Sequence, residues 1–165
     1  MSQRLHPLAR FAATPGAMRL AANVWPPMLF TGIHVEHIAA DFRQARVRLG
    51  KSPLTLNMFR TQFGGSMFAM TDPFWALMLS VNLGPGYIVW DQRAEIEFVR
   101  PGRTALATEF VLTPDIVDEI RDGAADGERV LRWFDNEICD RSGTIVARVR
   151  KQVYVRQKQA QRGVR

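Results

Sequence analysis

The chain has 165 residues, 47% of them hydrophobic and 23% charged, which provides the length and apolar content for one domain with a substantial core. No apolar run reaches the roughly 20 residues needed to span a bilayer, so we expect no stable membrane insertion. The single Cys139 excludes an internal disulfide and any cysteine-based metal cluster, and it favours a reducing, cytoplasmic location.

The net charge of +6 raises the question of nucleic-acid binding, but the distribution of the charge argues against it. Basic residues crowd the last 18 positions, and the rest of the chain is nearly balanced. We interpret residues 156–165 as a solvated or disordered basic tail that aids solubility. The functional alternative is that this tail attracts a phosphate-bearing small molecule.

The N-terminal region contains no acidic residue before Glu36, and three arginines lie among its apolar residues. An organelle transit peptide can have this pattern. Helical stretches that end at the Pro-Pro pair at 26–27 favour a different interpretation. We expect residues 1–32 to form a helical extension that packs on the domain.

The middle of the chain predicts a strand and then a helix. Residues 33–49 look extended, and a turn follows from Gly50 to Pro53. An apolar helix is expected from about residue 65 to residue 83, where the Gly-Pro-Gly sequence at 84–86 ends it.

The remainder alternates with period two, as expected for strands with one buried face. We predict four strands in a meander, at 93–99, 104–113, 129–140 and 144–157. One strand, a central helix and a run of antiparallel strands form an α+β arrangement. Because the helix is apolar on more than one face, one curled sheet face does not cover it, which points to a partner subunit.

One carboxylate, Asp72, interrupts the most hydrophobic segment and is followed directly by Pro73. Burying an unpaired carboxylate is costly, so Asp72 is either a local structural device or a working group. In the structural interpretation it is the N-cap of a second helix that starts at Pro73. In the functional interpretation it is a general base or a nucleophile. The two roles do not exclude each other.

The residues before Asp72 resemble those of the PaaI-like acyl-CoA thioesterases, which have the hotdog fold. Those enzymes open the central helix with His-Gly-Gly, with an Asn six residues before the His and a catalytic carboxylate seven residues after the second Gly. Here Asn57, Phe63-Gly64-Gly65 and Asp72 have the same spacings. The family's His, which positions the thioester and does not break bonds, is Phe63 in this chain.

A second part of the resemblance lies in the sequence Phe-Val-Arg-Pro-Gly at 98–102, which matches a strand ending that is frequent in the family. Arg100 in this sequence is either a surface strand end or a contact for a CoA phosphate. The resemblance covers roughly residues 33–155, where we place the domain. It implies a curved antiparallel sheet wrapped around the long helix, with Phe63, Gly64 and Arg100 as substrate contacts.

The chemistry of thioester hydrolysis can be matched to these residues. It needs an activated water or a carboxylate nucleophile, and it needs donors for the developing oxyanion. Asp72 supplies the carboxylate, and the free N–H groups at the helix start near Gly65 supply donors. Glycine at this position lets a carbonyl group approach the backbone closely. Asn57 supplies an amide that orients the water or the carbonyl, although it is also a common turn or cap residue.

Gly65 and Asp72 are too far apart to act on one carbonyl group within a single subunit. Seven residues of helix span about 10 Å. Two such helices that run antiparallel about a two-fold axis bring Gly65 of one subunit to Asp72 of the other. We therefore expect a homodimer with two shared sites, or a dimer of dimers.

The expected function is hydrolysis of an acyl-CoA or related acyl thioester, with no metal and no bound cofactor, CoA being part of the substrate. No nucleic-acid partner is expected. The alternative is a non-catalytic acyl-CoA or lipid-binding hotdog module, which the missing His favours. A hotdog dehydratase is a third option, but that chemistry usually needs a His with the carboxylate, and the helical segment contains none.

Overall fold

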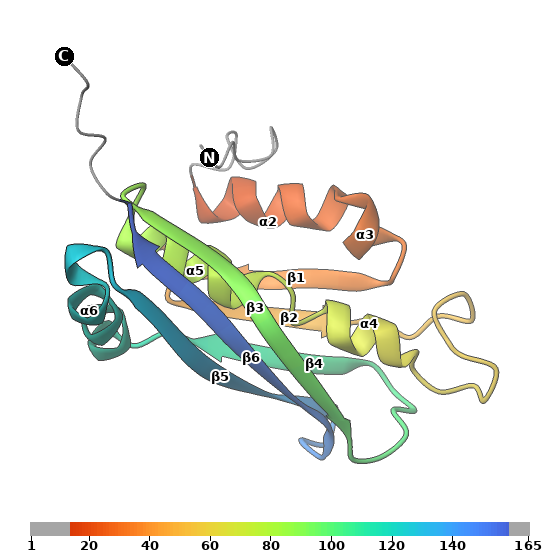
Figure 1. The fold of residues 1–165 in the computed structure, drawn as a ribbon. Helices are drawn as coiled ribbons and strands as arrows, with labels where there is room; N and C mark the ends of the chain where they lie inside the picture. The colour runs from red at the N-terminus through yellow and green to blue at the C-terminus, as the bar shows by residue number, and fades with distance from the viewer. Residues whose placement is uncertain (1–13, 159–165) are drawn as a thin grey trace.

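The computed structural model describes residues 14–158. A six-stranded antiparallel sheet curves around helix α5, and further helices lie at its two sides (Figure 1). The elements, in chain order, are α2 (Pro15–Val24), α3 (Pro26–Leu29), β1 (Ile33–Ile38), β2 (Gln44–Leu49), α4 (Gly64–Ala69), α5 (Phe74–Leu83), β3 (Tyr87–Phe98), β4 (Leu106–Val111), α6 (Pro114–Gly123), a short 3-10 turn (Ala125–Gly127), β5 (Arg129–Asp140) and β6 (Ile145–Gln157).

The segment predicted as one extended stretch, 33–49, is a hairpin of β1 and β2. Asp41 forms its turn, because the carboxylate accepts a hydrogen bond from the backbone N–H of Arg43 at 3.0 Å. Phe42 has a positive φ of 54° in this turn, and its side chain is buried. The prediction of a single strand was wrong because this turn contains neither glycine nor proline.

The strand order is β1-β2-β4-β5-β6-β3, so the predicted meander is also wrong. Strand β3 pairs with β6 at one edge of the sheet, and β4 pairs with β2 and β5. A period-two pattern identifies a strand and its buried face, but it does not identify the neighbour of that strand. The tight connection between β5 and β6 is present as predicted.

The predicted helix 65–83 is two helices, α4 and α5, separated by residues 70–73. Pro73 lacks a backbone N–H and cannot continue the hydrogen-bond ladder of α4. The two-helix alternative is therefore right, but its capping role for Asp72 is wrong. The N-cap of α5 is Pro73, with no side-chain capping bond, and the Asp72 carboxylate binds another residue.

Helix α5 fills the concave side of the sheet. Its buried side chains are Phe74, Trp75, Met78, Leu79 and Leu83. Apolar side chains continue around the rest of the helix, where Val81 is 45% exposed. One subunit therefore leaves part of an apolar helix in contact with water.

The sheet opens between strands β4 and β5. These two strands share only two residue pairs, Leu106 with Asp140 and Ala107 with Cys139. Beyond these pairs, a buried side chain replaces the backbone ladder. Asn136 of β5 donates to the carbonyl of Glu109 on β4 at 2.8 Å, and it accepts a hydrogen bond from Trp75 Nε1 at 2.6 Å. Asn136 therefore joins the two parts of the sheet and fastens α5 to them.

The outer elements complete the fold. Helices α2 and α3 are present as predicted, and Asn23 fastens α2 to β1 through two hydrogen bonds with the backbone of Val35. Helix α6, which the sequence analysis did not anticipate, is capped by Thr113 and packs near α5. Strand β6 ends at Gln157, as the predicted strand 144–157 does, so residues 156–157 belong to the strand and not to the predicted tail; residues 159–165 lie outside the described part.

None of the helices within residues 14–158 combines the length and the apolar composition that crossing a membrane requires.

We predict that Asn136→Ala destabilises the protein by about 1–3 kcal/mol, because it leaves the buried Trp75 N–H and the Glu109 carbonyl without partners. Urea unfolding monitored by tryptophan fluorescence measures the change. Asp135→Ala is the matched control on the same strand, since Asp135 is exposed and its ion pair with Arg150 lies in solvent. Equal losses for the two variants would contradict the role of Asn136.

Candidate active site

Asp72 lies in the break between α4 and α5, and its side chain is 52% exposed. Carboxylate Oδ1 accepts a hydrogen bond from Lys151 Nζ at 2.6 Å. Within the described residues, Oδ2 makes no hydrogen bond with another side chain. The carboxylate is therefore held by Lys151 through one oxygen, and about half of its side chain is exposed.

Lys151 belongs to the inner face of β6, and only 3% of its side chain is exposed. Its ammonium group also donates to Asp91 Oδ2 of β3 at 2.9 Å and lies 5.4 Å from the centroid of the Phe68 ring. Three elements thus supply one charged cluster, which we call the carboxylate cluster: Asp72, Asp91 and Lys151.

Asp91 is the more deeply buried carboxylate of the cluster, with 17% of its side chain exposed. Burial raises its pKa, the hydrogen bond and the charge of Lys151 oppose this rise, and the nearby Asp72 adds to it. Within the described residues, the buried Oδ1 of Asp91 has no hydrogen-bond partner. The ammonium group of Lys151 is therefore what allows a charged carboxylate at this depth.

The glycine pair lies at the start of α4, where two aromatic rings occupy the space that side chains would fill. A Cβ atom on Gly64 would lie 2.9 Å from Cζ of Phe98, and one on Gly65 would lie 2.5 Å from Cε1 of Phe63. The Phe63 side chain is exposed, so its ring is free to turn. Access to the backbone of Gly65 therefore depends on the position of this ring.

An open groove of ≈ 430 Å³ runs past Gly64 between the loop 57–62 and the end of β3. Phe98 and the exposed Arg100 line one side of it. Asn57 lines the other side, but its amide is used within its own loop. Its Oδ1 accepts from the backbone N–H groups of Phe59 and Thr61 at 2.9 and 3.1 Å, and its Nδ2 donates to the Thr61 hydroxyl at 2.9 Å.

The predicted site residues therefore fall into two sets within one subunit. Asn57, Gly64 and Arg100 line the groove, and Asp72 does not. Asp72 belongs to the carboxylate cluster at the other end of α4. Among the described residues, no three His, Cys, Asp or Glu side chains are grouped in a way that suits a metal ion.

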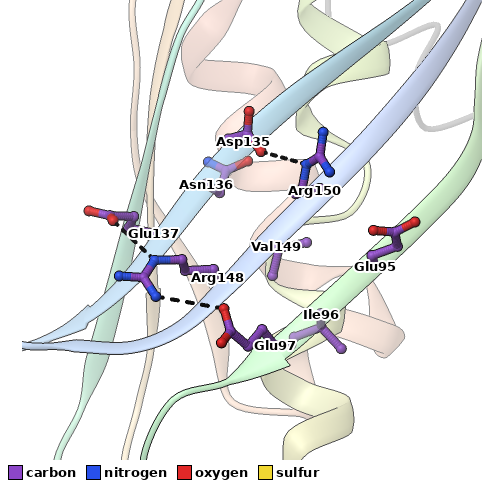
Figure 2. Close-up of a pocket in the computed structure, with 9 residues that line it drawn as sticks. All are labelled: Glu95, Ile96, Glu97, Asp135, Asn136, Glu137, Arg148, Val149 and Arg150. Carbon is purple, nitrogen blue, oxygen red and sulfur yellow. Dashed lines mark hydrogen bonds and ion pairs between the residues drawn. The ribbon is translucent and has the colours of Figure 1, made fainter.

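A second depression, of ≈ 450 Å³, lies on the face of the sheet opposite α5 (Figure 2). Figure 2 shows Arg148 between Glu97 and Glu137, and Arg150 paired with Asp135, at distances of 3.0–3.6 Å. These charges are exposed and compensate one another. This depression is a solvated face of the sheet, as the alternation of its strands indicates.

A family model described as a domain of unknown function, DUF4442, matches residues 17–155 of the chain. That match covers far more than half of the sequence. The chain belongs to the DUF4442 family. A sequence search of curated proteins finds no match.

Solved structures place the DUF4442 chain among known folds. A Pseudomonas aeruginosa protein of unknown function, described as a probable thioesterase, gives a TM-score of 0.75 at 14% identity, over 85% of this chain and 93% of that one. A Haemophilus influenzae thioesterase gives 0.65 at 12% identity, over 91% and 95%. The PaaI protein from the phenylacetic acid degradation operon of E. coli gives 0.54 at 17% identity, over 84% and 88%. These likenesses confirm the predicted hotdog fold.

Lys151 and Asp91 are the members of the carboxylate cluster that the sequence analysis missed. Lys151 was counted with the basic residues near the C-terminus. A signal was nevertheless present, because Lys151 occupies the same phase of the alternation as Val149 and Val153, which are buried. A charge at an inward position of a strand predicts a buried partner.

We predict that Lys151→Met destabilises the protein by about 3–5 kcal/mol at neutral pH, because it leaves Asp91 buried without a counter-charge. Since the pKa of Asp91 is already raised, the folded state favours its protonated form, so its contribution to stability is largest at low pH and is lost as pH rises. The deficit of the variant should therefore shrink as pH falls.

Chemical denaturation of both proteins over a range of pH measures this deficit. Arg150→Met is the matched control, because Arg150 is exposed on the same strand. The double variant Lys151→Met, Asp91→Asn should recover part of the loss. A deficit that does not change with pH would contradict the assignment of the cost to Asp91.

Proposed function

We propose that this protein hydrolyses an acyl-CoA or a related acyl thioester, with Asp72 as the general base or nucleophile. The observation that carries the proposal is the setting of this carboxylate, whose Oδ1 accepts a hydrogen bond from Lys151 while 52% of the side chain is exposed. Its spacing from the glycine pair matches that of the PaaI-like enzymes, and the fold is shared with proteins described as thioesterases.

The reaction needs few groups. If Asp72 acts as a base, Oδ2 removes a proton from a water molecule, whose oxygen attacks the thioester carbonyl carbon. The carbonyl oxygen becomes an oxyanion, which the free N–H group of Gly65 stabilises. Collapse of this intermediate breaks the carbon–sulfur bond, and the departing thiolate takes the proton. Because α4 has six residues, the donor itself matters more here than the helix dipole.

A two-fold axis supplies the geometry that one subunit lacks. Asp72 lies outside the groove that contains Gly64, so we place the thioester between Gly65 of one subunit and Asp72 of the other. Two features support this assembly. Strand β3 is an edge strand of 12 residues, and α5, which contacts β3, leaves the side chain of Val81 45% exposed. Pairing of two β3 edges protects both.

The groove suits the remaining parts of an acyl-CoA. Phe98 and Met67 provide apolar contact along it, and the exposed Arg100 at its rim provides a cation for a CoA phosphate. CoA is then part of the substrate, and no other cofactor enters the reaction.

The second candidate is a non-catalytic module that binds an acyl-CoA or a lipid. Two observations favour it. The ring of Phe63 covers Gly65, where the PaaI-like enzymes have a His, and the amide of Asn57 is used inside its own loop. Turnover of a bound thioester distinguishes the two candidates, because only the hydrolase releases a thiol.

Asp72→Asn distinguishes the enzyme from the binding module. Its Oδ1 still accepts a hydrogen bond from Lys151, so the fold should survive, but the amide cannot act as a base. We expect kcat to fall at least about a hundredfold while acyl-CoA still binds. Thiol release from a panel of acyl-CoAs measures turnover, and calorimetry measures binding. The control is Asp135→Asn on the outer face.

Full activity in Asp72→Asn would show that the catalytic assignment is wrong. Tight binding of acyl-CoA by the wild-type protein without any turnover would favour the binding module instead.

The shared site predicts a dimer of about twice 18.7 kDa in light scattering at micromolar concentration. It also predicts complementation between two inactive variants. When Asp72→Asn and Gly65→Val subunits are mixed and reassembled, half of the dimers contain both kinds, and each of these has one intact site. Activity should then return to about a quarter of the wild-type value. A stable monomer, or a mixture that remains inactive, would contradict the shared site.

A further inference from the structure

Among the described residues, Lys151 is the one charged residue that is buried, with 2% of the whole residue exposed. Removing an ammonium group from water costs several kcal/mol, and an apolar side chain of similar size generally stabilises such a position as well or better. Its neighbours on the inner face of β6, Val149 and Val153, are apolar. The charge is therefore not explained by packing.

The two carboxylates around this ammonium group differ in their exposure to solvent. Asp91 is largely buried, and Asp72 is about half exposed. Among the described residues, these two are the charged groups within hydrogen-bonding distance of Nζ, and the Phe68 ring lies on another side. If Lys151 had only a structural role, an ion pair with Asp91 would be enough to compensate its charge. Asp72 is a third member, and about half of its side chain is exposed to solvent.

We propose that Lys151 and Asp91 are positioning residues for the Asp72 carboxylate, a role that rests on the proposed hydrolase function. Lys151 holds Oδ1 so that Oδ2 points to the attacking water. A lone ammonium would also weaken Asp72 as a base, because it stabilises the charged form. Asp91 supplies a second negative charge that offsets the ammonium, so the net charge beside Asp72 depends on both residues.

The charges of the carboxylate cluster remain paired when Asp72 takes a proton from water. Before the attack it contains two carboxylates and one ammonium, with a net charge of −1. When Asp72 takes a proton from water, Lys151 is left with Asp91 as its ionic partner. The buried ammonium is therefore paired at both stages, and no uncompensated charge appears in the core.

The proposal predicts opposite changes for two variants in the pH dependence of kcat. Asp91→Asn removes a negative charge, so the acidic limb should move to lower pH, and the plateau should fall about threefold to tenfold because Asp72 becomes a weaker base. Lys151→Met removes the positive charge, so the acidic limb should move to higher pH by about one unit or more. KM for the acyl-CoA should change little, because neither side chain touches the substrate.

The experiment measures kcat and KM from about pH 5 to about pH 9 with acetyl- to palmitoyl-CoA, a range that brackets the titration of a carboxylate base. Opposite movements of the acidic limb support the proposal. A lower plateau with an unmoved limb in both variants overturns it and leaves a structural ion pair. The double variant Lys151→Met, Asp91→Asn, whose limb should return towards that of the wild type, replaces Lys151→Met if that single variant does not fold.

A second measurement separates failure of this proposal from failure of the hydrolase function. Carbon NMR of labelled aspartate follows the titration of Asp72 in the wild type and in each variant, without any substrate. If the wild type hydrolyses none of the thioesters, the proposed function fails. The titration then decides the coupling by itself: opposite shifts of Asp72 in the two variants support it, and an unmoved titration overturns it.

Discussion

Helix α5 is apolar on more than one face, apart from Ser80 and Asn82, and the arrangement of the other elements follows from the need to cover it. The curved sheet covers one side through the buried rings of Phe74 and Trp75, and α6 packs near the helix. The amide of Asn136 provides the hydrogen bond that a buried indole N–H requires. Val81 on this helix remains 45% exposed, and β3, which contacts α5, is an edge strand, so the same constraint that shapes the subunit favours association with a second copy.

The break between α4 and α5 is what makes a polar site compatible with this apolar core. A continuous helix would place position 72 inside its hydrogen-bond ladder, whereas Pro73 ends that ladder and lets the chain turn. The Asp72 carboxylate then reaches a buried ammonium on one side and solvent on the other. The core tolerates the ammonium because two carboxylates from different elements surround it, and each of these charges is costly without the others.

Much of this fold could be predicted from local patterns. The strands near the C-terminus were visible in their period-two alternation, and the motif from Asn57 to Asp72 identified the fold family. The turn around Phe42 was missed because an aspartate side chain forms it without glycine or proline. Strand order was missed because alternation carries no information about neighbours, and the contact between Lys151 and Asp91 depends on that order, since it requires β3 to lie beside β6. The inward phase of Lys151 was present in the sequence, but its partners could not be read from it.

The gap between β4 and β5 widens along the two strands. Backbone pairing holds the narrow end at Leu106 and Ala107, and side chains fill the wide end, where the Trp75 ring stacks on Phe134 at 4.4 Å and meets Phe110 edge-on. The angle between the two halves of the sheet therefore depends on the size of these rings as well as on the hydrogen bond from Asn136 to Glu109. One or two substitutions among them can move α5 nearer to the sheet or farther from it, and so change the space beside the helix, while every strand keeps its partners.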